Sequence, residues 1–173
     1  MTIPQIMEKM IRLSNGNIHD IEHFVKVWAC AKTIGEMENL DPETQFLLEA
    51  EAITHDIACP ACREKYGNAN GKLQEKESPA LIAAFFSDTD LTGPQTERVS
   101  FVVSHHHTYE GVDGPDWQIL LEADYVVNAS ENGCSGANIR QFLETQAKTE
   151  TGKRLIREVF CPEEGKENGT CNS

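Results

Sequence analysis

Hydrophobic residues recur at three- and four-residue steps along most of this chain, and that spacing marks one face of an α-helix. The pattern is clear in residues 46–57, where Phe46, Leu47, Ala50, Ile53 and Ile57 follow it. No run shows the alternation of a β-strand, and there are no convincing internal repeats. The sequence therefore predicts an all-α fold, a single bundle of about six to eight helices.

Turn and cap residues divide this pattern into segments. Asp41-Pro42 and Ser78-Pro79 each read as an N-cap followed by proline at the first helical position. The stretch from Cys59 to Glu77 is polar and contains glycines, so we expect a long loop there. The expected helices cover residues 6–13, 20–38, 42–57, 79–86, 99–105, 117–129, 139–147 and 153–160.

The length and charge of the chain narrow the classes of protein. Its 173 residues suit one domain, which we expect over residues 1–160, followed by a flexible tail over 161–173. No apolar run is long enough to span a membrane, and no export signal begins the sequence, so we expect a cytoplasmic location. A net charge of −13 argues against binding a nucleic-acid polymer, but it leaves room for a small phosphorylated substrate.

Histidine and aspartate residues interrupt several of the apolar helical patterns. His23, the pair His55-Asp56, His105 and Asp124 each stand among apolar neighbours on a separate predicted helix. Burying such groups is costly unless they neutralise one another or bind a metal. Imidazoles and carboxylates that converge from several helices form a good site for a divalent metal ion.

Three short blocks then show a resemblance to a known family. His23 to Val27, Ile53 to Ile57 and Leu121 to Asp124 resemble, in this order, the motif blocks of the HD-domain superfamily of metal-dependent phosphohydrolases. Lys26 stands where the family usually has arginine. The resemblance covers roughly residues 20–130. It implies an all-α fold and a metal held by His23, His55, Asp56 and Asp124, and it leaves the second pair, His19-Asp20, outside the site.

The same resemblance implies a reaction, namely attack of a metal-activated water on a small phosphoester, for which we expect a nucleotide. The metal would be Mn, Fe, Co, Ni or Mg. Asp56 would bind the metal and accept the proton of the water, with His105 and Lys26 as further catalytic groups. An ion pair with a nearby acid is the alternative role for Lys26. We expect the substrate to be bound by these further residues: His106, Arg63, Lys72 and Lys76.

The stretch from His105 to Gly111 resembles the paired histidines and acid-glycine of two-metal family members, including those that cleave cyclic dinucleotides. Those members have another histidine upstream, whereas residues 57–104 contain none, so a single metal is the preferred interpretation. Glu75 or Glu77 could supply the missing ligand. The alternatives are therefore a two-metal hydrolase of dinucleoside polyphosphates or cyclic dinucleotides, and an inactive domain that senses a metal or a nucleotide.

The C-x-x-C sequence at Cys59 and Cys62 is a further motif that can bind zinc or act as a redox pair. A structural zinc needs two more ligands, and the other cysteines form no second close pair. We therefore expect buried or loop cysteines without either role.

Overall fold

The computed structural model describes residues 1–161, so the expected flexible tail lies outside the described residues except for Cys161. The described residues form helices joined by short connections and contain no strand, which confirms the all-α class. The helices are α1 Ile3–Leu13, α2 Ile18–Met37, α3 Pro42–Thr54, α4 Cys59–Tyr66, α5 Gly71–Phe86, α6 Gly93–Val103, α7 Pro115–Asn132, α8 Gly136–Thr145 and α9 Glu150–Phe160.

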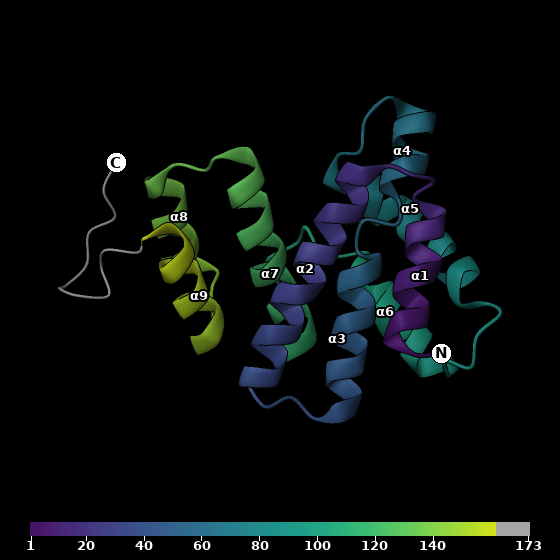
Figure 1. Cartoon of the computed structure of the whole chain (residues 1–173), viewed down its shortest axis with the longest axis horizontal. Coiled ribbons are helices and arrows are strands. Elements are labelled where there is room, and N and C mark those ends of the chain that lie inside the picture. The colour runs from purple at the N-terminus through teal and green to yellow at the C-terminus, as the bar shows by residue number, and fades with distance from the viewer. Residues whose placement is uncertain (162–173) are drawn as a thin grey trace.

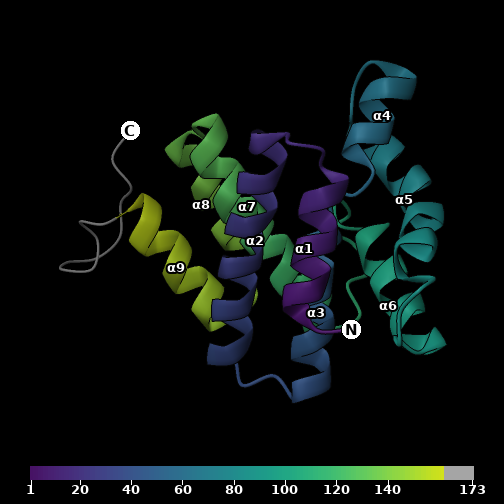
Figure 2. The ribbon, with the colours of Figure 1, turned by 45° about the vertical axis from the view of Figure 1, so that its right-hand side comes forward.

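Three helices form the centre of the molecule. Helices α2, α3 and α7 lie side by side, with α8 and α9 on one flank and α1, α5 and α6 on the other (Figures 1 and 2). Three clusters of buried apolar side chains fill these layers. Their members include Leu48 and Leu120 between the central helices, Ile53 and Ile82 toward α5, and Val126 and Ile156 toward α9. The central helices carry most of the residues that the sequence marks as functional.

Side-chain caps set the start of several helices. The Asp41 carboxylate accepts hydrogen bonds from the backbone N–H groups of Glu43 and Thr44, at 3.0 and 3.1 Å, and Pro42 opens α3. This arrangement confirms the cap expected for α3. It satisfies N–H groups that have no partner inside the helix.

The expected long loop from Cys59 to Glu77 is wrong. Residues 59–66 form α4, which ends at Gly67 with a φ of 73°, a left-handed conformation that glycine adopts without strain. Helix α5 begins after Asn70, whose side chain accepts from Leu73 N at 3.2 Å. The described residues therefore hold nine helices. The helical periodicity of α4 and of the first turns of α5 was not recognised, because both leave much of their surface exposed and are therefore rich in polar residues.

The expected helix start at Ser78-Pro79 is also wrong, since Pro79 lies inside α5. A proline in a helix lacks the N–H that would bond four residues back. The Ser78 hydroxyl donates to the Gln74 carbonyl at 2.7 Å in the same turn, so the serine acts within the helix instead of capping its start.

None of the helices over residues 1–161 is both long and apolar enough to cross a membrane.

Candidate metal centre

Two buried histidines face each other across the central helices. His23 lies in the second turn of α2, and His55 is the C-cap residue that follows α3; they are 5% and 0% exposed. The Nε2 atoms of the two rings lie 3.2 Å apart. The apolar periodicity of α2 and α3 turns both side chains inward, where water cannot solvate them.

The carboxylates of Asp56 and Asp124 reach the same point. One Asp124 oxygen lies 3.3 Å from His23 Nε2 and 3.5 Å from His55 Nε2. One Asp56 oxygen lies 3.6 and 3.7 Å from the same two nitrogens. Atoms bound to one ion at about 2.0–2.2 Å lie roughly 3.0–3.5 Å from one another, so these spacings are close to those of a ligand set.

The other ring nitrogens fix the direction of both imidazoles. His23 Nδ1 lies 2.9 Å from a Glu131 carboxylate oxygen, and His55 Nδ1 lies 2.9 Å from the Ala52 carbonyl. Both partners are acceptors, so each Nδ1 carries the proton and each Nε2 offers a lone pair to the centre. Hydrogen bonds of this kind orient histidines that bind metals. His23, His55 and Asp56, whose ligand atoms all lie within 4.8 Å of one another, therefore fit a divalent cation, and Asp124 contacts both imidazoles.

The charges of the centre shift the pKa values of its members. Burial opposes a proton on His23, but the contact with Asp124 and the charge of Asp56 outweigh it and raise the pKa to about 9. Burial likewise opposes ionisation of Asp56, but the charge of His55 and the contact with His106 hold its pKa well below its usual value. The pKa of Asp124 is lowered, against its own burial, by contacts with His23 and His55. The acids are therefore ionised, and either a protonated His23 or a bound metal ion can balance their charge.

A second group of possible ligands shares Asp56. Ligand atoms of Asp56, His106 and His107 lie within 4.8 Å of one another. His106 is 1% exposed, and its Nε2, which has no hydrogen-bond partner among the described residues, lies 3.6 Å from the other Asp56 oxygen. Asp56 thus stands between two groups; its side chain is 24% exposed, and His107 is the exposed member of the second group.

Helix α5 reaches this second group through its first residue. A Cβ atom added to Gly71 would lie 2.7 Å from the His107 ring, so only glycine allows this close approach. Burial and the neighbouring charge of His106 lower the pKa of His107 to about 4. His107 is therefore a neutral imidazole near neutral pH, and it has a lone pair available to a metal or a proton.

His105 lies outside the centre, contrary to expectation. Its Nδ1 lies 2.7 Å from the Phe101 carbonyl, and its ring packs between Phe101 and Trp117, with centroid distances of 4.5 and 5.6 Å. The stretch after α6 instead directs His106 toward Asp56. Helical spacing does not separate the two histidines, because His106 follows buried valines 102 and 103 by four and three residues, and His105 follows valines 99 and 102 by six and three.

Lys26 contacts an acid that the sequence analysis did not single out. Its Nζ lies 3.0 Å from one Glu131 oxygen, while the other Glu131 oxygen holds His23 Nδ1. The ion pair weighed as an alternative for Lys26 is therefore present. Glu131 lies seven residues after Asp124 on α7, and Asn128, between them, donates to Asp124 at 2.8 Å. Asp124, Asn128 and Glu131 form a polar stripe at helical spacing on α7, and from this spacing Glu131 could have been predicted as part of the site.

The other expected substrate-binding residues differ in their surroundings. Arg63 of α4 forms an ion pair with Asp20 of α2, which ties these helices together. Lys72 and Lys76 are exposed on α5, and the charge of Lys76 contributes to a lowered pKa of Glu77. The structure therefore does not gather Arg63, Lys72 and Lys76 around His106, whose ring faces Asp56.

Neither of the two ligand groups found within residues 1–161 contains the other residues considered as metal ligands, namely His19, Cys59, Cys62, Glu75 and Glu77. His19 is 80% exposed, as expected for the pair outside the site. Cys59 and Cys62 are free thiols, and no cysteine belongs to a possible ligand group within residues 1–161. Glu75 accepts a hydrogen bond from Thr108 at 2.9 Å, next to His107, whereas Glu77 binds Tyr66 and Lys65.

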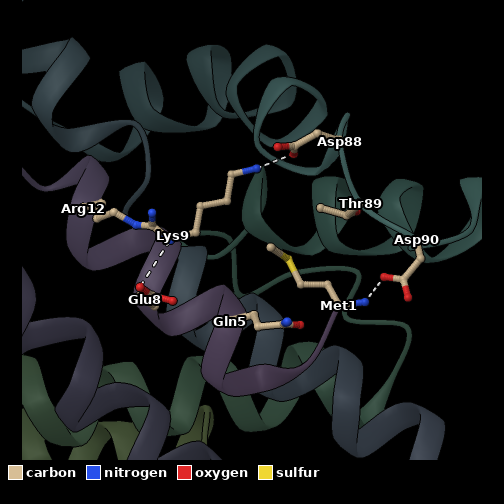
Figure 3. A pocket seen from close by; sticks show the side chains of 8 residues that line it. All are labelled: Met1, Gln5, Glu8, Lys9, Arg12, Asp88, Thr89 and Asp90. Atoms are coloured by element: carbon tan, nitrogen blue, oxygen red, sulfur yellow. Dashed lines mark hydrogen bonds and ion pairs between the residues drawn. The ribbon is translucent and has the colours of Figure 1, made fainter.

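A large hollow, about 720 Å³ in volume, lies between α1 and residues 88–90 (Figure 3). Its charged groups neutralise each other, because Lys9 pairs with Asp88, Arg12 pairs with Glu8 at 3.4 Å, and the amino group of Met1 pairs with Asp90. The hollow therefore offers no excess charge to a charged ligand.

Comparison with known proteins finds no matching family model, no matching curated protein and no matching solved structure.

Proposed function

We propose that this chain is a metal-dependent phosphohydrolase that acts on a small phosphoester, a nucleotide. The observation that supports the proposal most strongly is the convergence of His23 Nε2, His55 Nε2 and one oxygen each of Asp56 and Asp124. These residues would hold a divalent ion, Mn, Fe, Co, Ni or Mg. The cytoplasmic location expected from the sequence belongs to the same proposal.

When bound, the ion would lower the pKa of a water molecule and offset negative charge on the phosphoryl oxygens. The residues of the chain would do the rest. Asp56 is ionised and partly open to solvent, so it can accept a hydrogen bond from an attacking water and orient it, while its lowered pKa makes it a weak acceptor of the proton itself. His106, whose pKa is raised by its contact with Asp56 despite burial, can carry a positive charge toward a phosphate. The Glu131 carboxylate and the Ala52 carbonyl accept hydrogen bonds from Nδ1 of His23 and His55, which fixes the orientation of both rings.

The test is phosphate release from nucleoside mono-, di- and triphosphates with each metal in turn, before and after chelation. We expect release that depends on the metal and is lost in Asp56→Ala and His55→Ala. His19→Ala is the matched control, because His19 is exposed and also precedes an aspartate. Equal release by the wild-type and Asp56→Ala chains would overturn the mechanism.

The second group around Asp56 favours a two-metal version of the same chemistry. Asp56 offers one oxygen toward His23 and His55 and the other toward His106. In this version the chain hydrolyses dinucleoside polyphosphates or cyclic dinucleotides. Metal content decides between the versions: two ions per chain, falling to one in a His106→Ala, His107→Ala double variant, would favour two metals. One ion in both chains would favour the single-metal enzyme.

The remaining alternative is an inactive domain that senses a metal or a nucleotide. It predicts that the chain binds metal and nucleotide without releasing phosphate from any substrate in the screen. Binding of metal and nucleotide without phosphate release would therefore reject the enzyme and support the sensor.

A further inference from the structure

A hollow lined by aromatic and amide side chains lies between α7, α8 and the segment that follows α6. Its volume is about 240 Å³. Its lining residues are Tyr109, Tyr125, Asn138, Gln141, Phe142, Thr145 and Gln146. A second hollow, of about 450 Å³, shares Tyr109 and Gln146 with it and extends toward α7.

The aromatic rings of this hollow are arranged as two walls. Tyr125 and Phe142 are stacked, with ring centroids 3.5 Å apart and planes inclined by 6°. Tyr109 meets Phe142 at 5.9 Å with planes inclined by 80°. Tyr109 is 42% exposed. Its ring therefore provides a flat surface on which a planar molecule can stack.

The polar rim carries neutral side-chain amides. The Tyr125 hydroxyl donates to the Asn138 side-chain oxygen at 2.8 Å, a bond that does not use the amide hydrogens of Asn138. Gln141 and Gln146 add two more side-chain amides. Each such group offers a donor and an acceptor side by side, which matches the donor–acceptor edge of a nucleobase.

The hollow adjoins the metal centre. Tyr125 directly follows Asp124 on α7. Tyr109 also follows His107 by two residues. In a nucleotide bound this way, the sugar would connect a base in the hollow to a phosphate at the metal centre.

We infer that this hollow binds the base of the nucleotide substrate, with the base against Tyr109 and its edge at the amides of Asn138 and Gln141. The inference rests on the proposed function, because it assigns the non-phosphate part of the substrate of that site. It makes Tyr109 a specificity-determining residue of the enzyme.

The first test compares a nucleoside 5′-monophosphate with ribose 5-phosphate, which lacks the base, on the metal-loaded full chain. The measured quantity is the preference, the kcat/KM for the nucleotide divided by that for ribose 5-phosphate. We expect Tyr109→Ala to lower the preference roughly 5- to 100-fold, the range of one lost base–aromatic stack. Tyr109→Phe keeps the ring and should keep the preference within about threefold of wild type.

Phe101→Ala is the matched control, since Phe101 is also aromatic, is 40% exposed and lies away from the amide hollow. It should leave the preference unchanged. If Tyr109→Ala lowered kcat/KM for both substrates equally, or if the wild-type chain showed no preference for the nucleotide, the inference would be overturned.

A binding measurement separates failure of the hollow from failure of the proposed enzyme. Saturation-transfer NMR with adenosine, guanosine, cytidine and uridine detects base binding to the chelated chain without any turnover. We expect a signal for at least one nucleoside in the wild-type and His55→Ala chains and its loss in Tyr109→Ala. Nucleoside binding without phosphate release would reject the enzyme and keep the hollow. Phosphate release without nucleoside binding would reject the hollow.

Discussion

The Nε2 atoms of His23 and His55 lie 3.2 Å apart, although 32 residues separate them in the sequence. With Nδ1 protonated on both rings, two lone pairs would face each other, and only a proton or a metal ion relieves their repulsion. Asp56 and Asp124 add negative charge at the same point. This relationship underlies the first three predictions below.

The first prediction concerns metal content and heat stability. A metal that binds only the folded chain stabilises it by about 2.7 kcal/mol at a hundredfold excess over its Kd. We expect Mn or another fitting ion to raise the Tm of the wild-type chain, and His55→Ala to abolish both the rise and the bound metal. Differential scanning calorimetry and elemental analysis measure these. His19→Ala should behave as wild type; a Tm rise in His55→Ala would contradict the site.

The second prediction concerns the pH dependence of the chelated chain. The folded-state pKa of His23 is raised from 6.5 to about 9. Its contribution to stability is therefore fully present below pH 6.5 and is lost as the pH rises through 9. We expect the free energy of unfolding to fall by about 1–3 kcal/mol over that window, and this part of the fall to vanish in His23→Gln.

Urea unfolding of both chains at pH 6.5 and pH 9.5 measures the difference. The pKa of His106 is also raised, by its contact with Asp56 despite burial, so His106 adds a fall of the same sign in both chains. The difference between the two curves therefore measures His23 together with its coupling to His106 through Asp56. Identical pH dependence in the two chains would refute the assignment.

The third prediction concerns Glu131, the acid behind His23. Removing a hydrogen bond that orients a metal-bound histidine typically costs 10- to 100-fold in metal affinity. We expect Glu131→Ala, which removes this acceptor, to weaken metal binding by roughly this factor, measured by calorimetric titration. Glu36→Ala is the control, because Glu36 pairs with a lysine of the same helix, Lys32, at 2.8 Å. Equal affinities in the two variants would remove Glu131 from the site.

The fourth prediction concerns Glu122, which stands two residues before Asp124 but has a different role. Glu122 is 0% exposed, and its carboxylate accepts from Gln118 Nε2 at 2.7 Å, Lys148 N at 2.6 Å and Thr149 N at 3.0 Å. It thus anchors the start of α9. Glu122→Ala leaves these donors unpaired, so we expect a loss of about 2–5 kcal/mol in unfolding free energy.

Urea unfolding measures this loss, with the exposed Glu144→Ala as control, which should change stability by less than about 0.5 kcal/mol. A Glu122→Ala chain of wild-type stability would show that the buried carboxylate holds nothing in place.

The sequence alone predicted the all-α class, because helical periodicity is a local property that a window of residues already contains. Because buried ionisable residues are costly, the histidines 23, 55 and 105 and the aspartates 56 and 124 stood out among apolar neighbours. The family resemblance then implied that His23, His55, Asp56 and Asp124 hold a metal. The N-cap at Asp41 could also be predicted, because a helix cap involves only neighbouring residues in the sequence.

Tertiary structure alone decided which histidine after α6 turns inward, since one residue of rotation at a helix end exchanges His105 for His106. It also decided the partner of Lys26, because Glu131 lies 105 residues away along the chain. Helix α4 escaped prediction because its polar surface hides the periodicity, and the aromatic hollow exists only where α7 and α8 meet Tyr109. Such features depend on how separate helices pack, and no local pattern records that packing.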